Sequence, residues 1–163
     1  MNNTEKTTLD FGAILGGKWV ILEFIGKGGM GEVYRAHQTN LNRDVAIKVI
    51  SKQWLECLVE DDEEKETALK RFKREVQAMA GIQHPNVLRI FDYGMETIND
   101  EAVKEPLHYI AMEFIPGDTL RETMSEQGFY PETDLIRDWI GKYFLPVLDG
   151  VEAVHKCDMV HRD

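Results

Sequence analysis

An eight-residue glycine-rich segment, GKGGMGEV, limits most strongly how this chain can fold. It places Gly26, Gly28, Gly31 and Val33 in the pattern G-x-G-x-x-G-x-V. A strand-like apolar run, KWVILEFIG, precedes the glycines, and a second strand-like run, EVYRAHQT, follows them. The segment therefore predicts a hairpin between antiparallel strands, in which backbone without Cβ atoms can approach a ligand closely.

Three other interpretations of these glycines compete with a ligand-binding hairpin. A dinucleotide-binding loop also contains G-x-G-x-x-G, but there the glycines open a helix, whereas here a strand-like run follows them. A P-loop requires G-K-[ST], which the sequence lacks. An ordinary glycine-rich turn that binds no ligand stays open on the glycines alone.

The composition argues against several classes of function. A formal net charge of −10 is unfavourable for a general binder of nucleic acid or of anionic membranes, because both need basic patches. The polar first ten residues do not resemble a signal peptide, and no apolar run reaches membrane-spanning length. Cys57 and Cys157 lie far apart, which favours a reduced, cytoplasmic compartment. We expect no nucleic-acid partner and no membrane segment within residues 1–163.

The hydrophobic pattern predicts three more strands and two helical regions. The strands fall in RDVAIKVI, in the second half of HPNVLRIFDYG and in LHYIAMEFI. Helical spacing extends over residues 54–80 and again over residues 131–157. In the second region Pro146 removes one backbone hydrogen bond, so we expect a kink between Gly141 and Pro146.

Five strands with one inserted helix, followed by helices only, are typical of an α+β fold. The pattern divides the chain into four parts. A loose polar tail over residues 1–15 is followed by a strand lobe over 16–111, a connecting segment over 112–118 and the start of a helical lobe over 119–163.

Lys48 ends the third predicted strand and shares a face with Ala46, because strand side chains alternate. A lysine that points into a covered cleft needs a counter-charge. Glu75 is the best candidate, since its spacing from Phe72 and Met79 predicts that it faces inward with them. The competing interpretation is that Glu75 is a surface acid, as most glutamates are.

Several motifs in order resemble the eukaryotic-type protein kinase family: G-x-G-x-x-G-x-V, V-A-I-K, a helical glutamate, MEFIPGD and H-R-D. GKGGMGEVYRA together with HPNVLRIFDYG looks most like the bacterial serine/threonine kinases of this type. The resemblance covers about residues 17–163. It implies a kinase N-lobe, a five-stranded antiparallel sheet plus one helix, followed by the truncated start of the helical C-lobe.

The resemblance also implies a site for ATP. Lys48 would hold the phosphates and pair with Glu75, and Asp163 would accept the proton of the substrate hydroxyl. The other nucleotide contacts that it implies come from the glycine loop, the strand faces and the hinge: Gly26, Lys27, Gly28, Gly29, Met30, Gly31, Val33, Ala46, Met112, Glu113, Ile115 and Asp118.

The family pattern continues after H-R-D with an asparagine and a D-F-G aspartate that bind Mg²⁺, and then with A-P-E. None of these motifs follows Asp163, so we expect no metal ligands here, although the intact kinase would need Mg²⁺. The resemblance thus implies the N-terminal part of an ATP-dependent serine/threonine kinase of protein substrates, inactive as this chain alone. The alternative is a non-catalytic module that binds nucleotide or a partner. The apolar final helix also predicts self-association.

Overall fold

The computed structural model describes residues 7–56, 62–97, 106–122, 137 and 139–160. The chain forms two compact units. The first comprises Met1–Ala80 and Arg89–Phe114, and the second comprises Gly81–Leu88 and Ile115–Asp163. Residues 81–88, which the sequence places in the strand lobe, therefore group with the second unit.

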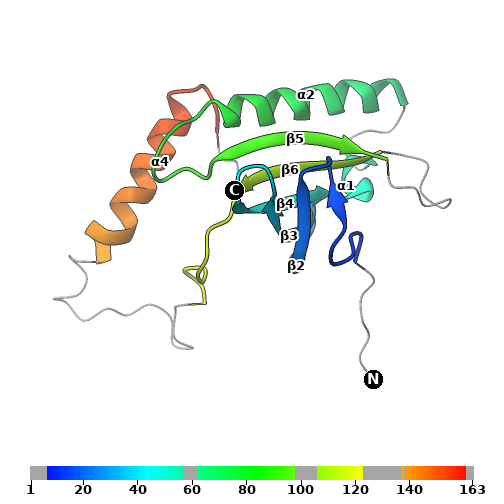
Figure 1. Cartoon of the computed structure of the whole chain (residues 1–163). Helices are drawn as coiled ribbons and strands as arrows, with labels where there is room; N and C mark the ends of the chain where they lie inside the picture. The colour runs from blue at the N-terminus through cyan, green and yellow to red at the C-terminus, as the bar shows by residue number, and fades with distance from the viewer. Residues whose placement is uncertain (1–6, 57–61, 98–105, 123–136, 138, 161–163) are drawn as a thin grey trace. The chain divides into compact units, whose positions relative to one another are not determined.

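The first unit is built on a six-stranded antiparallel sheet with the strand order β1-β2-β3-β4-β6-β5 (Figure 1). All five predicted strands are present, and the predicted α+β class is confirmed; the two-residue β1 is additional. The strands are β1 (Ile14–Leu15), β2 (Trp19–Gly28), β3 (Gly31–Gln38), β4 (Arg43–Ile50), β5 (Ile90–Glu96) and β6 (Leu107–Glu113).

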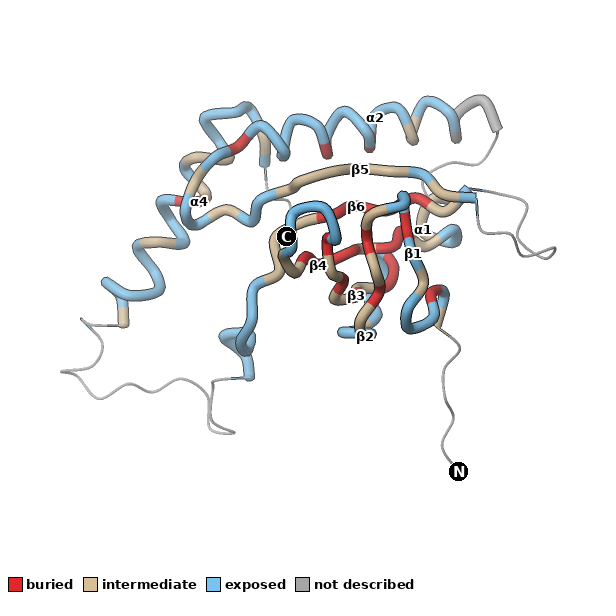
Figure 2. Tube along the Cα trace, viewed as in Figure 1, coloured by how far each residue is buried: buried red, intermediate tan, exposed pale blue. Residues whose placement is uncertain are grey.

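The sheet buries a different apolar cluster on each face, because successive strand residues point to opposite sides. The larger cluster lies on what is here called the strap face and includes Trp19, Tyr34 and Ile47. The smaller cluster lies on the opposite face, here called the helix face, and joins Ile50 and Ile110 to the helices. Figure 2 shows the buried residues concentrated on the central strands.

Residues 7–15, here called the N-terminal strap, pack onto the sheet. Leu9 and Leu15 are 7% and 2% exposed and belong to the cluster on the strap face. Ile21 of β2 donates its N–H to the carbonyl of Ala13 at 2.9 Å. The prediction of a loose tail is wrong for these residues, because two buried leucines hold a segment whose composition is mostly polar.

Two helices occupy the region where the sequence predicts one, namely α1 (Lys52–Glu56) and α2 (Asp62–Ala80). α2 lies alongside β5 (Figure 1). Phe72 and Val76, four residues apart and therefore on one side of the helix, are 9% and 4% exposed. This narrow apolar stripe is what packs α2 onto the helix face of the sheet.

In the second unit, a π-helical turn, η1 (Ile140–Phe144), leads directly into α4 (Leu145–His155). Pro146 is the second residue of α4, and because helical backbone precedes it, its missing N–H leaves a gap in the helical hydrogen bonds. The N–H of Leu145 bonds the carbonyl of Ile140, five residues back. Where the sequence predicts a kink, the structure thus has a π-helical turn, another common way of accommodating an irregular helix.

The second unit is held together around one carboxylate and one glycine of α4. Asp149 Oδ2 accepts a hydrogen bond from the Asn86 amide at 3.4 Å and lies 3.2 Å from His84 Nε2. Gly150 is buried, and the backbone of Asn86 packs so closely against it that a Cβ at this position would lie 2.7 Å from the Asn86 carbonyl oxygen. Most other α4 residues are exposed or half-buried (Figure 2). Within the described parts of the chain, no helix has the length and apolar character needed to cross a membrane.

Candidate functional site

The glycine segment forms the predicted hairpin between β2 and β3. Gly28 pairs with Gly31 across the two strands, and Gly26 pairs with Val33. A strand rather than a helix follows the glycines, so the dinucleotide-loop interpretation does not hold.

The two sides of this turn differ in the space around them. Gly31 has a φ of +142°, and a Cβ there would lie 1.9 Å from the carbonyl oxygen of Val49. Only glycine fits this close approach of two backbones. A Cβ at Gly28 or Gly29 would meet nothing within 4 Å. The turn is therefore fixed against β4 at its C-terminal side and has open, exposed backbone at its N-terminal side.

Four of the proposed site residues share the helix face of the sheet. Val33 lies opposite Lys48 on the neighbouring strand, and Ala46 lies opposite Met112. Directly opposed residues of antiparallel strands point to the same face. The register of β3, β4 and β6 therefore brings a small apolar surface and one ammonium group together beside the hairpin.

The Lys48 ammonium contacts the turn of the hairpin. Its Nζ lies 3.5 Å from Met30 Sδ, and a thioether sulfur is only a weak acceptor. Ser51 donates its N–H to the Met30 carbonyl at 2.9 Å, which ties this turn residue to the end of β4. Among the residues that the structure describes, no carboxylate forms an ion pair with Lys48. The ammonium is therefore suited to receive an anionic ligand.

Glu75 is exposed, so the prediction that it is turned inward together with Phe72 and Met79 is wrong. The helix turns Phe72 and Val76 towards the sheet, and Glu75 is rotated by about 100° from Val76. Met79 is 43% exposed. The pair between Glu75 and Lys48 is not formed in this structure, and its role in a reaction stays a prediction.

The remaining predicted contacts are divided between the two units. Glu113 ends β6, and its N–H donates to the Arg89 carbonyl at 2.9 Å. Ile115 and Asp118 belong to the second unit, where both are exposed. Asp163, the predicted base, lies outside the described residues.

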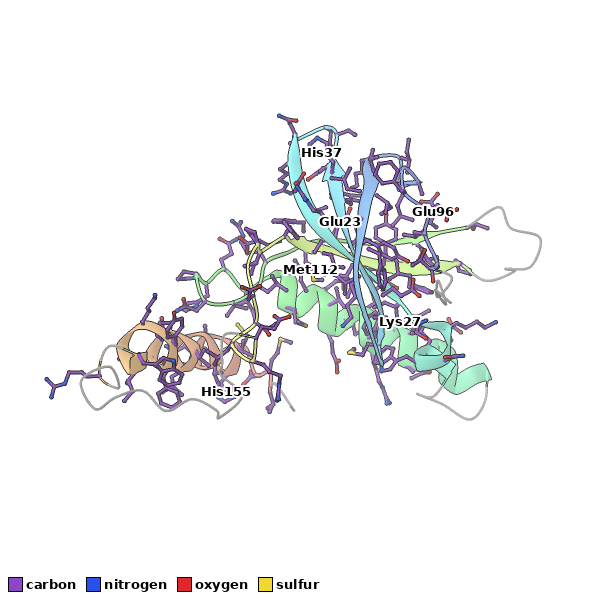
Figure 3. The ribbon with its side chains drawn as sticks, turned by 90° about the horizontal axis from the view of Figure 1, so that it is seen from below. Glu23, Lys27, His37, Glu96, Met112 and His155 are labelled. Atoms are coloured by element: carbon purple, nitrogen blue, oxygen red, sulfur yellow. The ribbon has the colours of Figure 1, made fainter. Side chains whose placement is uncertain are left out.

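Lys27 and Glu32 oppose each other across the hairpin, on the face away from Val33. Lys27 Nζ is 3.4 Å from Glu32 Oε1. The Lys27 side chain, labelled in Figure 3, therefore lies on the face of the sheet opposite to Lys48. Glu32 itself is only 6% exposed. Its burial was not predicted, although Glu32 alternates with the apolar residues Tyr34 and Ala36 along one strand.

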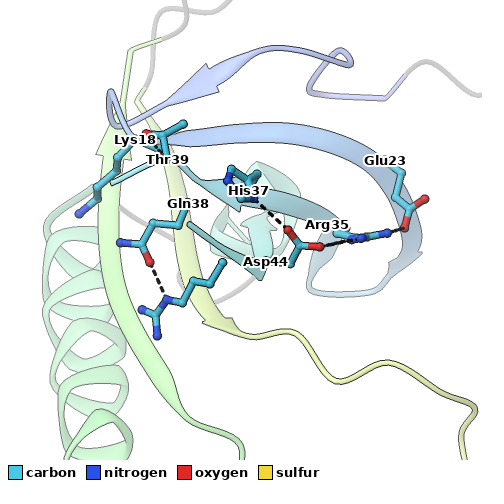
Figure 4. Close-up of polar contacts among 8 residues, drawn as sticks. Lys18, Glu23, Arg35, His37, Gln38, Thr39 and Asp44 are labelled. Carbon is cyan, nitrogen blue, oxygen red and sulfur yellow. Dashed lines mark hydrogen bonds and ion pairs between the residues drawn. The ribbon is translucent and has the colours of Figure 1, made fainter. Parts of the chain in front are cut away.

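A network of charged residues that the sequence pattern does not predict flanks the same face as Lys48. Arg35 donates to Asp44 from Nε at 2.9 Å and from Nη2 at 2.6 Å, and its Nη1 lies 3.4 Å from Glu23 (Figure 4). The hydrogen bond with His37 and then those from Arg35 lower the pKa of Asp44. The Arg35 guanidinium also covers the Phe114 ring at 5.2 Å. The network therefore links three strands to the residue that follows β6.

Asp10-Phe11-Gly12 has the letters of the kinase D-F-G motif but belongs to the N-terminal strap. Phe11 is 81% exposed, and Gly12 has a φ of +80°. The tripeptide precedes the glycine hairpin, whereas the family motif follows H-R-D, so the resemblance gives it no role. Within the described residues, no three His, Cys, Asp or Glu side chains gather closely enough to hold a metal ion.

Comparisons with known proteins agree with the architecture. Residues 19–163 match the family model of the protein kinase domain. The chain is 35% identical over 152 residues to the probable serine/threonine-protein kinase PknB of Bifidobacterium longum. It is 31% identical over 153 residues to the serine/threonine-protein kinase PrkC of Bacillus subtilis. Each alignment covers 93% of this chain and 20% of the relative, so the chain spans about one fifth of the length of these relatives.

Solved structures share the fold. The PknI kinase domain of Mycobacterium tuberculosis has a TM-score of 0.68 at 22% identity, over 96% of this chain and 54% of that one. PpkA in its apo form has a TM-score of 0.70 at 23% identity, over 97% of this chain and 55% of that one. Identities this low show the fold alone, but the family match covers most of the sequence. This chain belongs to the protein kinase family.

Proposed function

We propose that this chain is the nucleotide-binding portion of a serine/threonine protein kinase, which transfers the terminal phosphoryl group of ATP to a protein hydroxyl. The observation that carries the proposal is the shared face on which Val33, Ala46 and Lys48 lie beside the glycine hairpin. The names of the bacterial relatives support the choice of serine and threonine over tyrosine.

The residues of this face would bind and orient ATP. Val33 and Ala46 offer small apolar contacts to the flat adenine ring, and the exposed backbone of Gly28 and Gly29 can approach the phosphates. Lys48 would exchange its weak thioether contact for charge-assisted hydrogen bonds to phosphate oxygens. Placing the phosphates and neutralising their charge is most of what catalyses phosphoryl transfer.

Other parts of the reaction fall on residues that the resemblance assigns. Met112 would lie behind the adenine pocket, the Glu113 carbonyl and the Ile115 N–H would bond the adenine edge, and Asp118 would lie near the ribose. Asp163 would accept the proton of the substrate hydroxyl. Mg²⁺, when bound with ATP, neutralises phosphate charge, and the resemblance assigns its ligands to motifs that follow Asp163 in the family.

Substitution of Lys48 tests the nucleotide site. We expect Lys48→Met to weaken ATP binding by at least about 10-fold, measured by titration calorimetry on the purified chain, because the phosphates lose their charged partner. Lys70→Met is the matched control, since Lys70 pairs with Glu66 on the surface of α2. Equal ATP affinity in wild type and Lys48→Met would refute the proposed site.

A partner-binding module without catalysis is the second candidate, favoured by apolar side chains exposed on η1 and α4. Phe144, Leu145 and Val147 are 48%, 54% and 59% exposed. Exposed apolar surface of this kind promotes association. Size-exclusion chromatography over a range of concentrations, together with the ATP titration, separates the two candidates. A monomer that binds ATP supports the nucleotide site. A concentration-dependent oligomer that does not bind ATP supports the partner-binding module.

A further inference from the structure

A carboxylate lies buried directly after the last glycine of the hairpin. Glu32 follows Gly31 and is 6% exposed. Its Oε2 accepts hydrogen bonds from the Tyr34 hydroxyl and, at 2.9 Å, from the backbone N–H of Thr8. Its Oε1 lies 3.4 Å from the Lys27 ammonium. A buried carboxylate is unfavourable unless such donors surround it, so all three contacts matter to its position.

Two of these donors depend on the N-terminal strap. The N–H of Thr8 bonds Glu32 directly, and the next N–H, that of Leu9, donates to the Tyr34 hydroxyl at 3.1 Å. That hydroxyl in turn donates to Glu32. Consecutive backbone N–H groups of the strap therefore connect to the carboxylate, one directly and one through the Tyr34 hydroxyl. The Leu9 side chain lies in the core of the strap face.

The ionisation states fit this arrangement. Burial by itself would raise the pKa of Glu32, but the hydrogen bonds from Tyr34 and then from Thr8 outweigh burial and lower it. Burial and then the contact with Glu32 raise the pKa of Tyr34 to about 12. At neutral pH, Glu32 is therefore an anionic acceptor and Tyr34 a neutral donor.

The same arrangement fixes one arm of the glycine hairpin. Glu32 adjoins Gly31, whose backbone already meets the Val49 carbonyl so closely that no Cβ fits. The opposite side of the turn, at Gly28 and Gly29, has open surroundings. The strap contacts of Glu32 therefore act at the residue that adjoins the fixed end of the turn.

We infer that Glu32 is a positioning residue of the nucleotide site, which couples the N-terminal strap to the glycine hairpin so that strap packing sets the affinity for ATP. The inference rests on the proposed function, because it concerns the same hairpin. Glu32 lies on the face opposite to Lys48 and acts on the ligand only through the backbone of the hairpin.

Variants on both sides of the contact test this coupling. Glu32→Ala removes the acceptor, Leu9→Ser loosens the strap, and the double variant combines them. We expect each single variant to weaken ATP binding about 3- to 10-fold, because a hairpin that must be ordered on binding binds less tightly. The double variant should be no weaker than the worse single variant, since both break one connection. ATP affinity is measured by titration calorimetry at a temperature at which every variant is folded.

Two controls separate positioning from general destabilisation. Glu32→Gln retains a side-chain oxygen that can accept from Thr8 and should keep more ATP affinity than Glu32→Ala. Ile82→Val removes a methylene group from a buried position of the second unit, outside the strap and the hairpin, and should leave ATP affinity unchanged. Wild-type ATP affinity in both single variants, or losses that add in the double variant, would overturn the inference.

Amide hydrogen exchange keeps the inference testable if the wild type does not bind ATP. A wild type that does not bind ATP would refute the proposed function, and the coupling between strap and hairpin would then be tested by hydrogen exchange without nucleotide. We then expect Leu9→Ser and Glu32→Ala to accelerate exchange equally in the peptide that spans residues 24–33. Unchanged exchange of this peptide in Leu9→Ser would overturn the coupling.

Discussion

The two faces of the sheet in the first unit are closed in different ways. On the strap face, large side chains such as Trp19 and Ile47 are almost fully buried, and even the charged Glu32 is buried among donors. On the helix face, the Lys48 ammonium contacts only a thioether among the residues that the structure describes, and Glu75 stays exposed. The packing free energy thus lies mainly on the strap face, while the Lys48 ammonium of the helix face can change its partner at little cost.

This difference suits a site that must hold its backbone still and exchange ligands. Close-packed side chains and satisfied buried hydrogen bonds resist displacement. The Lys48 ammonium loses only a weak hydrogen bond to a thioether when it binds an anion. Substitutions on the strap face should therefore affect stability first, and substitutions on the helix face should affect nucleotide binding first.

The largest expected effect belongs to the core of the strap face. Ile47 is 0% exposed, and Ile47→Ala should lower the free energy of unfolding by about 2–5 kcal/mol, through lost burial and the cavity left behind. Ile14→Ala is the matched control, because Ile14 is 63% exposed. Urea denaturation followed by circular dichroism measures both. A similar loss for the two variants would show that the strap face is not the main store of stability.

The next effect concerns the fixed end of the hairpin. Gly31→Ala should lower the free energy of unfolding by about 1–3 kcal/mol, because a Cβ there would lie 1.9 Å from the Val49 carbonyl and φ is +142°. Gly29→Ala should change it little, since its Cβ meets nothing within 4 Å. Thermal melts compare the two variants. Equal melting temperatures would mean that the turn relaxes freely on both sides.

The sequence predicts the helix-face elements well because their signals are local. Alternating apolar residues indicate the strands, and glycines at fixed spacing indicate the hairpin. Lys48 and Ala46 share a face by strand alternation alone, and β4 places both beside Val33. These features need no knowledge of what lies across the molecule.

The strap and the orientation of Glu75 could not be predicted, because long-range contacts decide them. The polar composition of residues 1–15 hides Leu9, whose burial depends on Tyr34 and Glu32 more than twenty positions away. On α2, the spacing from Phe72 allowed Glu75 to be placed on the buried side, but Val76 completes the packed stripe instead. Helical periodicity predicts which residues share a side of the helix, but the contacts with the sheet decide which side is buried.

A smaller effect, specific to the strap face, depends on pH. The folded-state pKa of Glu32 lies below its ordinary value of 4.5, so its stabilisation is present above that value and is lost as pH falls through the folded pKa. Wild type should exceed Glu32→Gln in unfolding free energy by about 1 kcal/mol at pH 7. The gap should narrow as the pH falls below 4.5. Urea titrations across this range measure it, and a gap independent of pH would mean that the charge of Glu32 contributes nothing.

The smallest effect on stability is expected at Lys48, where the comparison of the two faces is most sharply tested. Its ammonium forms no ion pair with the described residues, so Lys48→Met should change the free energy of unfolding without nucleotide by less than about 0.5 kcal/mol. ATP at 100 times its dissociation constant should stabilise the wild type by about 2.7 kcal/mol, through preferential binding to the folded chain. The same ATP concentration should stabilise Lys48→Met much less, because the phosphates lose their partner. A large loss of stability without nucleotide would instead make Lys48 part of the structural framework, and the two faces would no longer differ in the way described.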